Sequence, residues 1–216
     1  MIKESLKKVY YFLHNFKFKI TDNAFSLVCK KRLKNKDFSI ICSNCIGGII
    51  YHRLGERFLS PTINMWIRQN EFLKLVSNLK YYMSLELDFI DSKYDYPVAK
   101  LDDVRIHFNH SKKIEEAKND WEKRKKRINY DNLYIILYDR DDVELDKIND
   151  IIGRTNFKNI AVLTEHEEHA TEEYIYYIKK TKRDRANKNY FIDKDKFNLR
   201  TFEKQFDFVK WLNTEI

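Results

Sequence analysis

The chain has 216 residues, 43% of them hydrophobic and 15% aromatic, so it can bury a sizeable core, and wholesale disorder is excluded. Its four glycines and two prolines are too few for an all-β protein built on tight turns. Lys and Arg outnumber Asp and Glu by 41 to 33, and the formal charge of +8 favours anionic partners. The lysines are spread along the chain, however, and no RNA-binding, zinc-finger or basic-zipper pattern accompanies them. A solvated basic surface is therefore preferred, and nucleic acid is disfavoured.

The cysteine count and the apolar runs predict a reduced, cytoplasmic protein. No apolar run is long enough to span a bilayer, and residues 1–8 lack the apolar core of a secretory signal. Three cysteines are an odd number in a chain that needs no disulfide to fold, so none is expected. The basic amphipathic segment at 3–17 can lie on an anionic membrane surface, but packing on its own domain is preferred.

Apolar residues at helical or alternating spacing predict the elements, taken here in chain order. They are helices over 3–17 and 22–33, a buried strand over 38–42, a helix over 46–54, a helix over 62–82, a strand over 85–90, a strand over 104–108, a helix over 111–128, a strand over 133–137, a helix over 143–152, a strand over 160–163, a helix over 171–182 and a helix over 202–212.

Strands that alternate with helices predict an α/β fold, a three-layer α/β/α arrangement around a mostly parallel sheet. The strands near 38–42, 104–108, 132–138 and 159–163 are expected to be parallel neighbours or near neighbours. No linker or internal repeat divides the chain. Residues 1–216 are therefore predicted to form a single domain, with 1–35 as a helical extension packed on it.

Polar side chains follow each predicted strand where it ends. They are Ser43-Asn44-Cys45, Asn109-His110-Ser111, Asp139-Arg140-Asp141-Asp142 and Thr164-Glu165-His166. Because ligands of open parallel sheets bind beyond the carboxyl ends of the strands, this set predicts a site along one edge of the sheet. For any one of these residues a plain helix cap is an equally good explanation.

The turn after the first buried strand is the predicted phosphate site. Backbone N–H groups in the first turn of a helix are unpaired, and glycines let an anion approach the backbone. Asn44, Gly47 and Gly48 are therefore predicted to bind the phosphate of an activated donor. In the alternative interpretation the two glycines permit close helix packing and Asn44 only caps the helix.

Three further residues are predicted to be catalytic. His110 titrates near neutral pH and is the predicted base that activates an acceptor hydroxyl. Asp139 and Asp141 offer oxygen ligands that suit Mg²⁺ or Mn²⁺ bridging a diphosphate, although Asp-x-Asp clusters are frequent in loops. Arg124 borders the buried stripe near Trp121 and is predicted to clamp a phosphate or to form a structural ion pair.

Cys42 and Cys45 form a C-x-x-C pair between a strand and a helix, as in thioredoxin-like redox proteins. A helix N-terminus lowers the pKa of a thiol and favours the reactive thiolate. Cys42 ends an apolar run, and the flanking Trp and Pro of the redox motif are missing, so a buried, structural Cys42 is preferred. Cys45 as a nucleophile and the pair as a thiol-redox site are kept as alternatives.

Several stretches together resemble a bacterial family of unassigned biochemistry, domain-of-unknown-function family nineteen-nineteen, often labelled exopolysaccharide biosynthesis protein. The matching stretches are residues 43–48, 59–62, 96–98, 101–110, 121–129 and 139–141, within a region from about 38 to 163. The family pattern often has an aromatic residue before the glycine pair, where this chain has Ile46.

The resemblance implies a cytoplasmic α/β protein that acts in surface-polysaccharide biosynthesis. It implies a glycosyl or acyl transferase whose activated donor is a sugar nucleotide or acyl-CoA, and whose acceptor is a polysaccharide or lipid-linked intermediate. A non-catalytic binding or accessory protein of the same pathway is the alternative.

Overall fold

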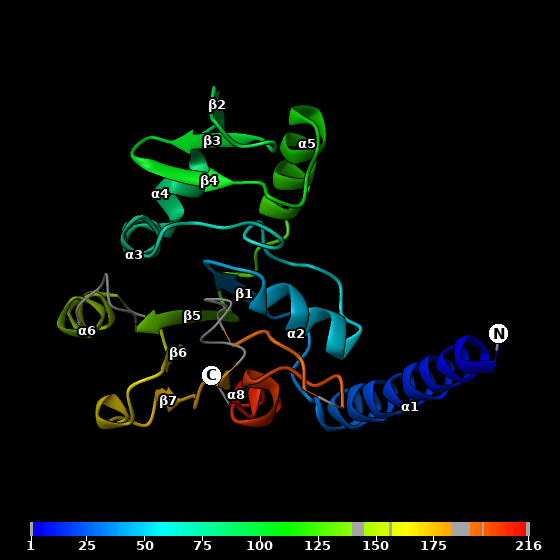
Figure 1. The fold of residues 1–216 in the computed structure, drawn as a ribbon. Coiled ribbons are helices and arrows are strands. Elements are labelled where there is room, and N and C mark those ends of the chain that lie inside the picture. The colour runs from blue at the N-terminus through cyan, green and yellow to red at the C-terminus, as the bar shows by residue number, and fades with distance from the viewer. Residues whose placement is uncertain (1, 140–144, 156, 183–190, 196, 215–216) are drawn as a thin grey trace.

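A four-stranded parallel sheet with strand order β1-β5-β6-β7 forms the centre of the protein (Figure 1). The computed structural model describes residues 2–139, 145–155, 157–182, 191–195 and 197–214, and for 2–15 and 17 it describes the backbone alone. Three of the strands are buried along their whole length, as uninterrupted apolar runs predict for a sheet covered on both faces. The strands are β1 (Ser39–Cys42), β5 (Leu133–Asp139), β6 (Asn159–Thr164) and the edge strand β7 (Ile175–Tyr177).

Side chains alternate across this sheet into two separate apolar cores. Tyr134, Ile136 and Tyr138 of β5 belong to one core, whereas Ile135 and Leu137 belong to the other. The first core contains residues of α1 (Ile2–Arg32), α2 (Ile46–Leu54), the 3₁₀ turn η2 (Phe202–Lys204) and α8 (Phe208–Leu212). The second contains residues of α3 (Gln69–Ser77), α4 (Leu79–Ser84) and α6 (Leu145–Arg154). The predicted α/β fold with helices on both faces of a parallel sheet is confirmed.

A small antiparallel sheet lies beyond α3 and α4 and shares the second core (Figure 1). It consists of β2 (Asp88–Ile90), β3 (Val98–Leu101) and β4 (Val104–His107), and α5 (Ile114–Lys125) buries Trp121 and Ala117 against it. The expectation that 104–108 joins the parallel sheet is therefore wrong. The reason is local: β3 and β4 form a hairpin, and Asp102 in the tight turn between them has a φ of 54°.

The predicted helix over 62–82 begins later and is split in two, as α3 and α4. Residues before Gln69 are held by a non-local pairing, because Trp66 and His107 exchange two backbone hydrogen bonds of 2.9 Å each. Ser60 followed by Pro61 is a typical helix start, a capping residue before a proline at the first helical position, but the pairing with β4 overrides it.

Two other predicted helices also differ from the structure. The segment 171–182 contains β7, whose β-branched and aromatic residues pair with β6 instead of forming a helix. At the N-terminus one helix replaces two, because the Thr21 hydroxyl donates to the Phe18 carbonyl within a continuous helix rather than capping a new one. Although α1 has 31 residues, no helix in the described part of the chain is apolar enough over a sufficient length to cross a bilayer.

Candidate active site

The carboxyl ends of β1, β5 and β6 meet at one edge of the parallel sheet. Cys42 pairs with Ile136, and Asp139 pairs with Thr164, so Asp139 lies three residues beyond the level at which β1 ends. Asn44 and Asp139 therefore follow neighbouring parallel strands at the same edge, as the sequence predicts. Since β4 belongs to the other sheet, His110 reaches this edge by a different route, through its contact with Cys45.

Asp139 is the buried centre of a hydrogen-bond network at this edge. Its side chain is only 4% exposed, and its Oδ2 accepts a hydrogen bond of 2.7 Å from the Thr164 hydroxyl and pairs with His169 Nδ1. The Thr164 hydroxyl in turn accepts a hydrogen bond from the backbone N–H of His166. This network fixes the carboxylate against β6 and the start of the next turn.

His169 lies in the 3₁₀ turn η1 (Glu167–His169), directly after β6. The hydrogen bond and the negative charge of Asp139 raise the pKa of His169 above its ordinary value. The ring of His166 packs beside it, with a distance of 4.8 Å between the ring centroids. Because Nδ1 is bound to Asp139 and the side chain is 35% exposed, Nε2 is the ring nitrogen that remains for an external group.

A cysteine–histidine pair lies just after the end of β1. The Sγ atom of Cys45 is 3.4 Å from Nε2 of His110, which is exposed in the loop between β4 and α5. Cys45 occupies the N-cap position of α2 and is partly exposed. Burial raises the pKa of its thiol, whereas the charge of Arg200 lowers it.

Cys42 has a different environment. It is fully buried, which raises the pKa of its thiol to about 11, and its sulfur donates to Asn44 Oδ1 at 3.3 Å. The preferred interpretation of Cys42 as a structural residue is consistent with this burial. Cys29, Cys42 and Cys45 are free thiols in the structure.

The predicted phosphate-binding turn uses several of its polar groups internally. Asn44 is buried, and its Oδ1 accepts hydrogen bonds from the Ile46 N–H at 3.0 Å and the Tyr138 hydroxyl at 3.2 Å, besides the one from Cys42. The backbone N–H of Gly47 points to the Cys42 sulfur, which favours the thiolate of that residue. Two N–H groups at the start of α2 thus have partners inside the protein.

The two glycines are buried beneath a neighbouring segment, residues 63–67, which we call the covering segment. A Cβ atom on Gly48 would lie 2.8 Å from Asn64 Oδ1 and 3.2 Å from Ile63 Cγ2, and one on Gly47 would lie 3.4 Å from atoms of three side chains. Close packing against these two side chains thus favours a glycine at 48 without any ligand. Phosphate binding at this turn stays a prediction.

Arg124 binds that same covering segment. Its guanidinium donates to the Ile63 carbonyl at 3.1 Å, pairs with Asp120 at 2.5 Å and lies over the ring of Phe58. Burial and the charge of Arg127 lower its pKa. The structural ion pair predicted for Arg124 is present, and the side chain also lines a basic cavity of about 350 Å³ on the α5 side of the molecule. Ile63 contacts both Arg124, through its carbonyl, and the space above Gly48, through its side chain.

The metal prediction falls partly outside the described residues, because Asp141 lies in the segment 140–144. Within the described part of the chain, no three His, Cys, Asp or Glu side chains are grouped as a metal site. Asp139 already contacts Thr164 and His169, and it has the oxygen chemistry for a cation but no second described carboxylate beside it in such a group.

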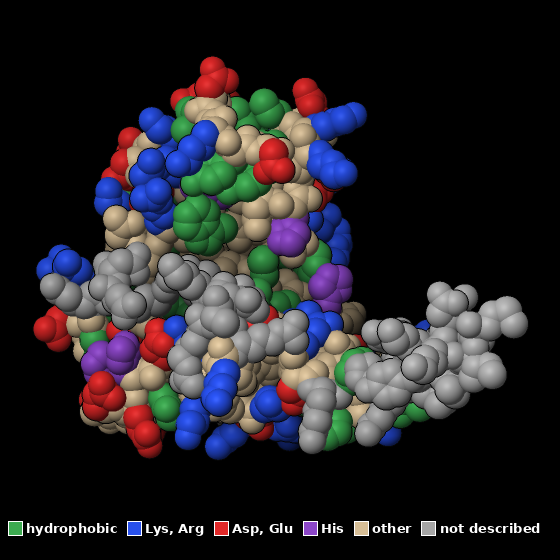
Figure 2. All heavy atoms as spheres, in the orientation of Figure 1, with side chains coloured by type: hydrophobic (Ala, Val, Ile, Leu, Met, Phe, Trp, Pro, Cys, Tyr) green, Lys and Arg blue, Asp and Glu red, His purple; other side chains and the backbone are tan. Residues whose placement is uncertain are grey.

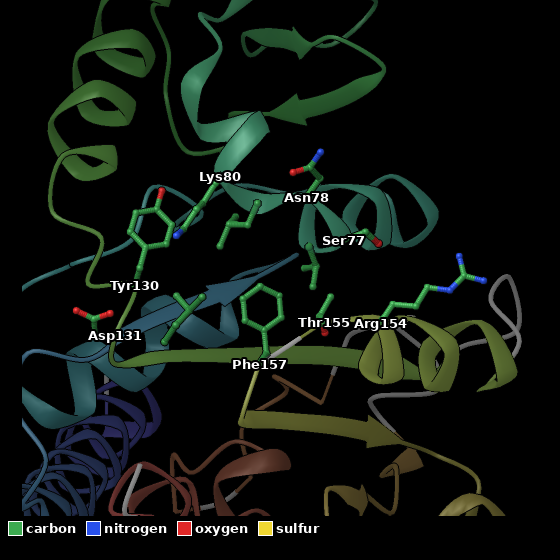
Figure 3. A pocket seen from close by; sticks show the side chains of 11 residues that line it. Ser77, Asn78, Lys80, Tyr130, Asp131, Arg154, Thr155 and Phe157 are labelled. Atoms are coloured by element: carbon green, nitrogen blue, oxygen red, sulfur yellow. The ribbon is translucent and has the colours of Figure 1, made fainter.

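A separate cavity lies at the opposite end of the sheet. It has a volume of about 410 Å³ and lies near the start of β5, between the α3–α4 junction and the end of α6 (Figure 3). Lys80, Tyr130, Arg154 and Phe157 line it, and none of the described candidate residues does. In open parallel sheets ligands bind at the carboxyl ends, so we assign the candidate site to the chemical groups at that edge rather than to this cavity.

The surface is consistent with a mixed rather than a uniformly basic charge. Figure 2 shows Lys and Arg side chains gathered beside hydrophobic ones on the upper part of the molecule, whereas they alternate with Asp and Glu below. Two of the exposed basic residues, Lys100 of β3 and Arg105 of β4, lie on the antiparallel sheet.

Two features of the site were missed in the sequence. His169 lies just beyond the polar stretch 164–166 predicted as part of the site, and its position shortly after the end of a strand is the signal that could have found it. The contact of Cys45 with His110 joins residues 65 positions apart, and a contact over this sequence distance cannot be predicted from a local sequence pattern.

The fold and this edge define an α/β protein with imidazole groups held at the carboxyl ends of parallel strands. The family model described as "Domain of unknown function (DUF1919)" matches residues 16–213, and the chain belongs to this family. The match extends well beyond the stretches at 38–163 that carry the resemblance in sequence. The chain is also similar to an uncharacterized protein of Haemophilus influenzae, with 33% identity over 184 residues, which is 85% of this chain and 88% of the relative.

Proposed function

We propose that this protein is a group-transfer enzyme that moves a glycosyl or acyl group from an activated donor to a hydroxyl acceptor. The observation that carries the proposal is the pair formed by Asp139 and His169 at the carboxyl edge of the parallel sheet. A buried carboxylate that binds one imidazole nitrogen fixes the ring and leaves the other nitrogen as a base. An acceptor hydroxyl bound at this edge would lose its proton to Nε2 of His169.

His169 takes the role that the sequence suggested for His110. Both imidazoles lie at the site, but only His169 is oriented by a buried carboxylate, whereas His110 Nε2 contacts the thiol of Cys45. A neutral imidazole must accept the proton, so the rate should rise with pH through the pKa of His169. Because Asp139 raises that pKa, the base is also stronger once it is neutral.

The donor and acceptor are proposed from the family resemblance. The donor would be a sugar nucleotide or acyl-CoA with its phosphate near the start of α2, and the acceptor a polysaccharide or lipid-linked intermediate. A cation such as Mg²⁺ or Mn²⁺ at Asp139 and Asp141 belongs to the sugar-nucleotide case. The competing proposal is an accessory protein that binds such a molecule without transforming it.

Turnover of a donor panel tests the proposal. UDP-sugars and acyl-CoAs would be incubated with the protein and hydroxyl acceptors, with and without Mg²⁺ or Mn²⁺, and release of UDP or CoA measured. We expect His169→Gln to lower the rate by about 10²-fold or more, the scale of a lost general base. His166→Gln is the matched control, because its ring lies beside His169 but lacks the bond to Asp139, and it should retain most of the rate.

Two results would contradict the proposal. A rate unchanged in His169→Gln would remove this residue as the base. Binding of a donor without turnover under any condition would favour the accessory protein.

A further inference from the structure

Cys45 differs from the other two cysteines in its surroundings. Cys29 and Cys42 are buried in the apolar core on one face of the sheet, and burial raises the pKa of each thiol to about 11. Cys45 is partly exposed at the carboxyl edge, and its sulfur contacts an exposed imidazole. Only this thiol combines access from outside with a base within reach.

The pair of Cys45 and His110 has the geometry of an activated nucleophile. A sulfur 3.4 Å from Nε2 can transfer its proton to the imidazole as it attacks, so a thiol that is neutral at rest still reacts. Arg200 adds a positive charge near the sulfur, and the N-terminal end of α2 adds a favourable dipole for a thiolate. The nucleophile and the base come from separate segments, the N-terminus of α2 and the loop after β4.

The covering segment fixes this arrangement. The backbone N–H of Ile67 donates to the Ser43 carbonyl at 3.0 Å, and the adjacent Trp66 is bonded to His107, three residues before His110. The turn that carries Cys45 and the strand that leads to His110 are therefore tied to consecutive residues of one segment. The pair is thus held by two backbone connections.

We infer that Cys45 carries the transferred group as a thioester and that the donor is an acyl thioester; this inference rests on the proposed transfer function. In the first step the Cys45 proton passes to His110 Nε2, Sγ bonds to the acyl carbon, the carbon–sulfur bond of the donor breaks, and the leaving thiolate takes the proton. In the second step the acceptor oxygen bonds to the acyl carbon, the bond to Sγ breaks, and the hydroxyl proton passes through a histidine to Sγ. Atoms and charge balance without an oxidant, a reductant or a metal ion.

The chemistry of sulfur selects the acyl donor over the sugar nucleotide. A thiol that attacks a thioester forms another thioester of similar reactivity, which a hydroxyl can then attack. A thiol that attacks a sugar nucleotide would form a thioglycoside, a stable product from which the sugar is not readily transferred. A thiol nucleophile at this edge therefore fits acyl transfer.

The first test uses acetyl-CoA as the probe and the full chain without acceptor. Intact mass spectrometry should show addition of one acetyl group, and peptide mapping should place it on Cys45. Cys45→Ser should abolish the thioester adduct, while Cys29→Ala, which removes a buried thiol, should leave it unchanged. An acetyl group absent from Cys45, together with iodoacetamide alkylation of Cys45 no faster than that of a free thiol, would overturn the inference.

The second test addresses His110. His110→Gln should slow acetylation of Cys45 at least tenfold at neutral pH, and raising the pH should restore the rate as the thiol ionises by itself. A merely structural role for His110 would give a loss that pH does not restore, and that outcome would overturn its assignment as the base.

Failure of this inference is distinguishable from failure of the proposed function. If Cys45→Ala still transfers a group to the acceptor and His169→Gln does not, the thioester is wrong and the transfer function stands. If Cys45 is acetylated but the acyl group never leaves for a hydroxyl, the nucleophile is supported and the transfer function fails.

Discussion

His110 and His169 show that the partner of an imidazole, rather than its exposure alone, decides what it can do. His169 is bound to a buried carboxylate, which raises its pKa and fixes the free nitrogen. His110 faces a thiol instead. His107, only three residues earlier, is buried against Trp66, with 4.3 Å between ring centroids, and burial lowers its pKa. The three histidines thus differ in environment: one is paired with a carboxylate, one with a thiol, and one is buried against a tryptophan.

The pKa of His169 gives a prediction for Asp139→Asn. Because the folded-state pKa of His169 is raised, protonation of the pair stabilises the protein at pH values below the ordinary pKa of about 6.5, and this contribution is lost as the pH rises through the folded-state pKa. The variant should lower the His169 pKa measured by NMR. Its unfolding free energy should approach that of the parent as the pH rises from about 5.5 to about 9.

Glu168→Gln is the control for this titration, because Glu168 contributes less than Asp139 to the shift. It should lower the His169 pKa by a smaller amount. An unchanged His169 titration in Asp139→Asn would mean that the carboxylate does not hold the ring.

A pair of glycine substitutions separates packing from local flexibility. Gly48→Ala should destabilise the protein by about 1–3 kcal/mol, because the added Cβ meets Asn64 and Ile63. Gly153→Ala should stabilise it by about 0.5–1 kcal/mol, because Gly153 lies in α6 with nothing within 4 Å of the new Cβ. Denaturant unfolding measures both. Equal stability of Gly48→Ala and the parent would show that Asn64 and Ile63 can move to accommodate the added Cβ at little cost in free energy.

The site could be predicted from the sequence only in part. Asn44, Cys45 and Asp139 follow uninterrupted apolar strands, so their place at one edge follows from topology rules. The use of Asn44 Oδ1 inside its own turn, and the meeting of Asp139 with His169, depend on side-chain contacts between strands. Such contacts leave no periodic signal in the chain.

At the scale of elements, a buried ion pair joins three segments that lie far apart in sequence. Arg53 of α2 pairs with Glu203 of η2 at 2.5 Å and with Asp22 of α1 at 2.6 Å, and the Arg53 and Glu203 side chains are 5% and 0% exposed. Breaking a buried pair by removing one partner costs about 3–5 kcal/mol. Without Arg53, the buried Glu203 keeps its longer ion pair with Arg200, at 3.5 Å. Arg53 therefore links α1 and η2 to α2, in addition to the apolar core that these elements share.

Arg53→Met should accordingly lower the unfolding free energy by about 3–5 kcal/mol, and Glu203→Gln should also lower it. Combining Arg53→Met with Glu203→Leu should cost much less than the two single changes together, since neither charge is then buried alone. Urea unfolding of the set gives the coupling energy. Strict additivity would show that the pair contributes no specific interaction.

The elements that the sequence predicts well are those whose surroundings are uniform. β1, β5 and β6 are buried on both faces, so their residues are apolar or aromatic except at the strand ends, where Ser39, Asp139, Asn159 and Thr164 lie. The errors fall where a non-local contact decides: Trp66 pairs with His107, and Ile175 to Tyr177 pair with β6. At these places the sequence pattern predicts a helix, but backbone hydrogen bonds with distant strands determine the structure.

At the scale of the whole molecule, one core joins the two sheets. Ile135 and Leu137 of the parallel sheet share it with Val104 and Ile106 of the antiparallel sheet, and Trp121 of α5 is fully buried within it. A continuous apolar core makes separate unfolding of the two sheets costly, because unfolding of either one would expose apolar side chains of the shared core. The prediction of a single domain over residues 1–216 therefore implies that both sheets unfold together in one cooperative transition.

The tryptophans provide the probes for this last prediction. Trp66 and Trp121 lie on the side of the antiparallel sheet, whereas Trp211 of α8 packs in the core on the opposite face of the parallel sheet. In Trp211→Phe the remaining fluorescence reports on the side of the antiparallel sheet. In the double variant Trp66→Phe and Trp121→Phe it reports on the core around α8. For each variant we expect the fluorescence midpoint in urea to coincide with the midpoint from far-ultraviolet circular dichroism, as two-state unfolding requires. Comparison within each variant removes the effect of the substitutions on stability. If the antiparallel side lost its fluorescence signal before the secondary structure of the parallel sheet melted, the chain would contain two units, and the contacts between Cys45 and His110 would then depend on how firmly these units dock.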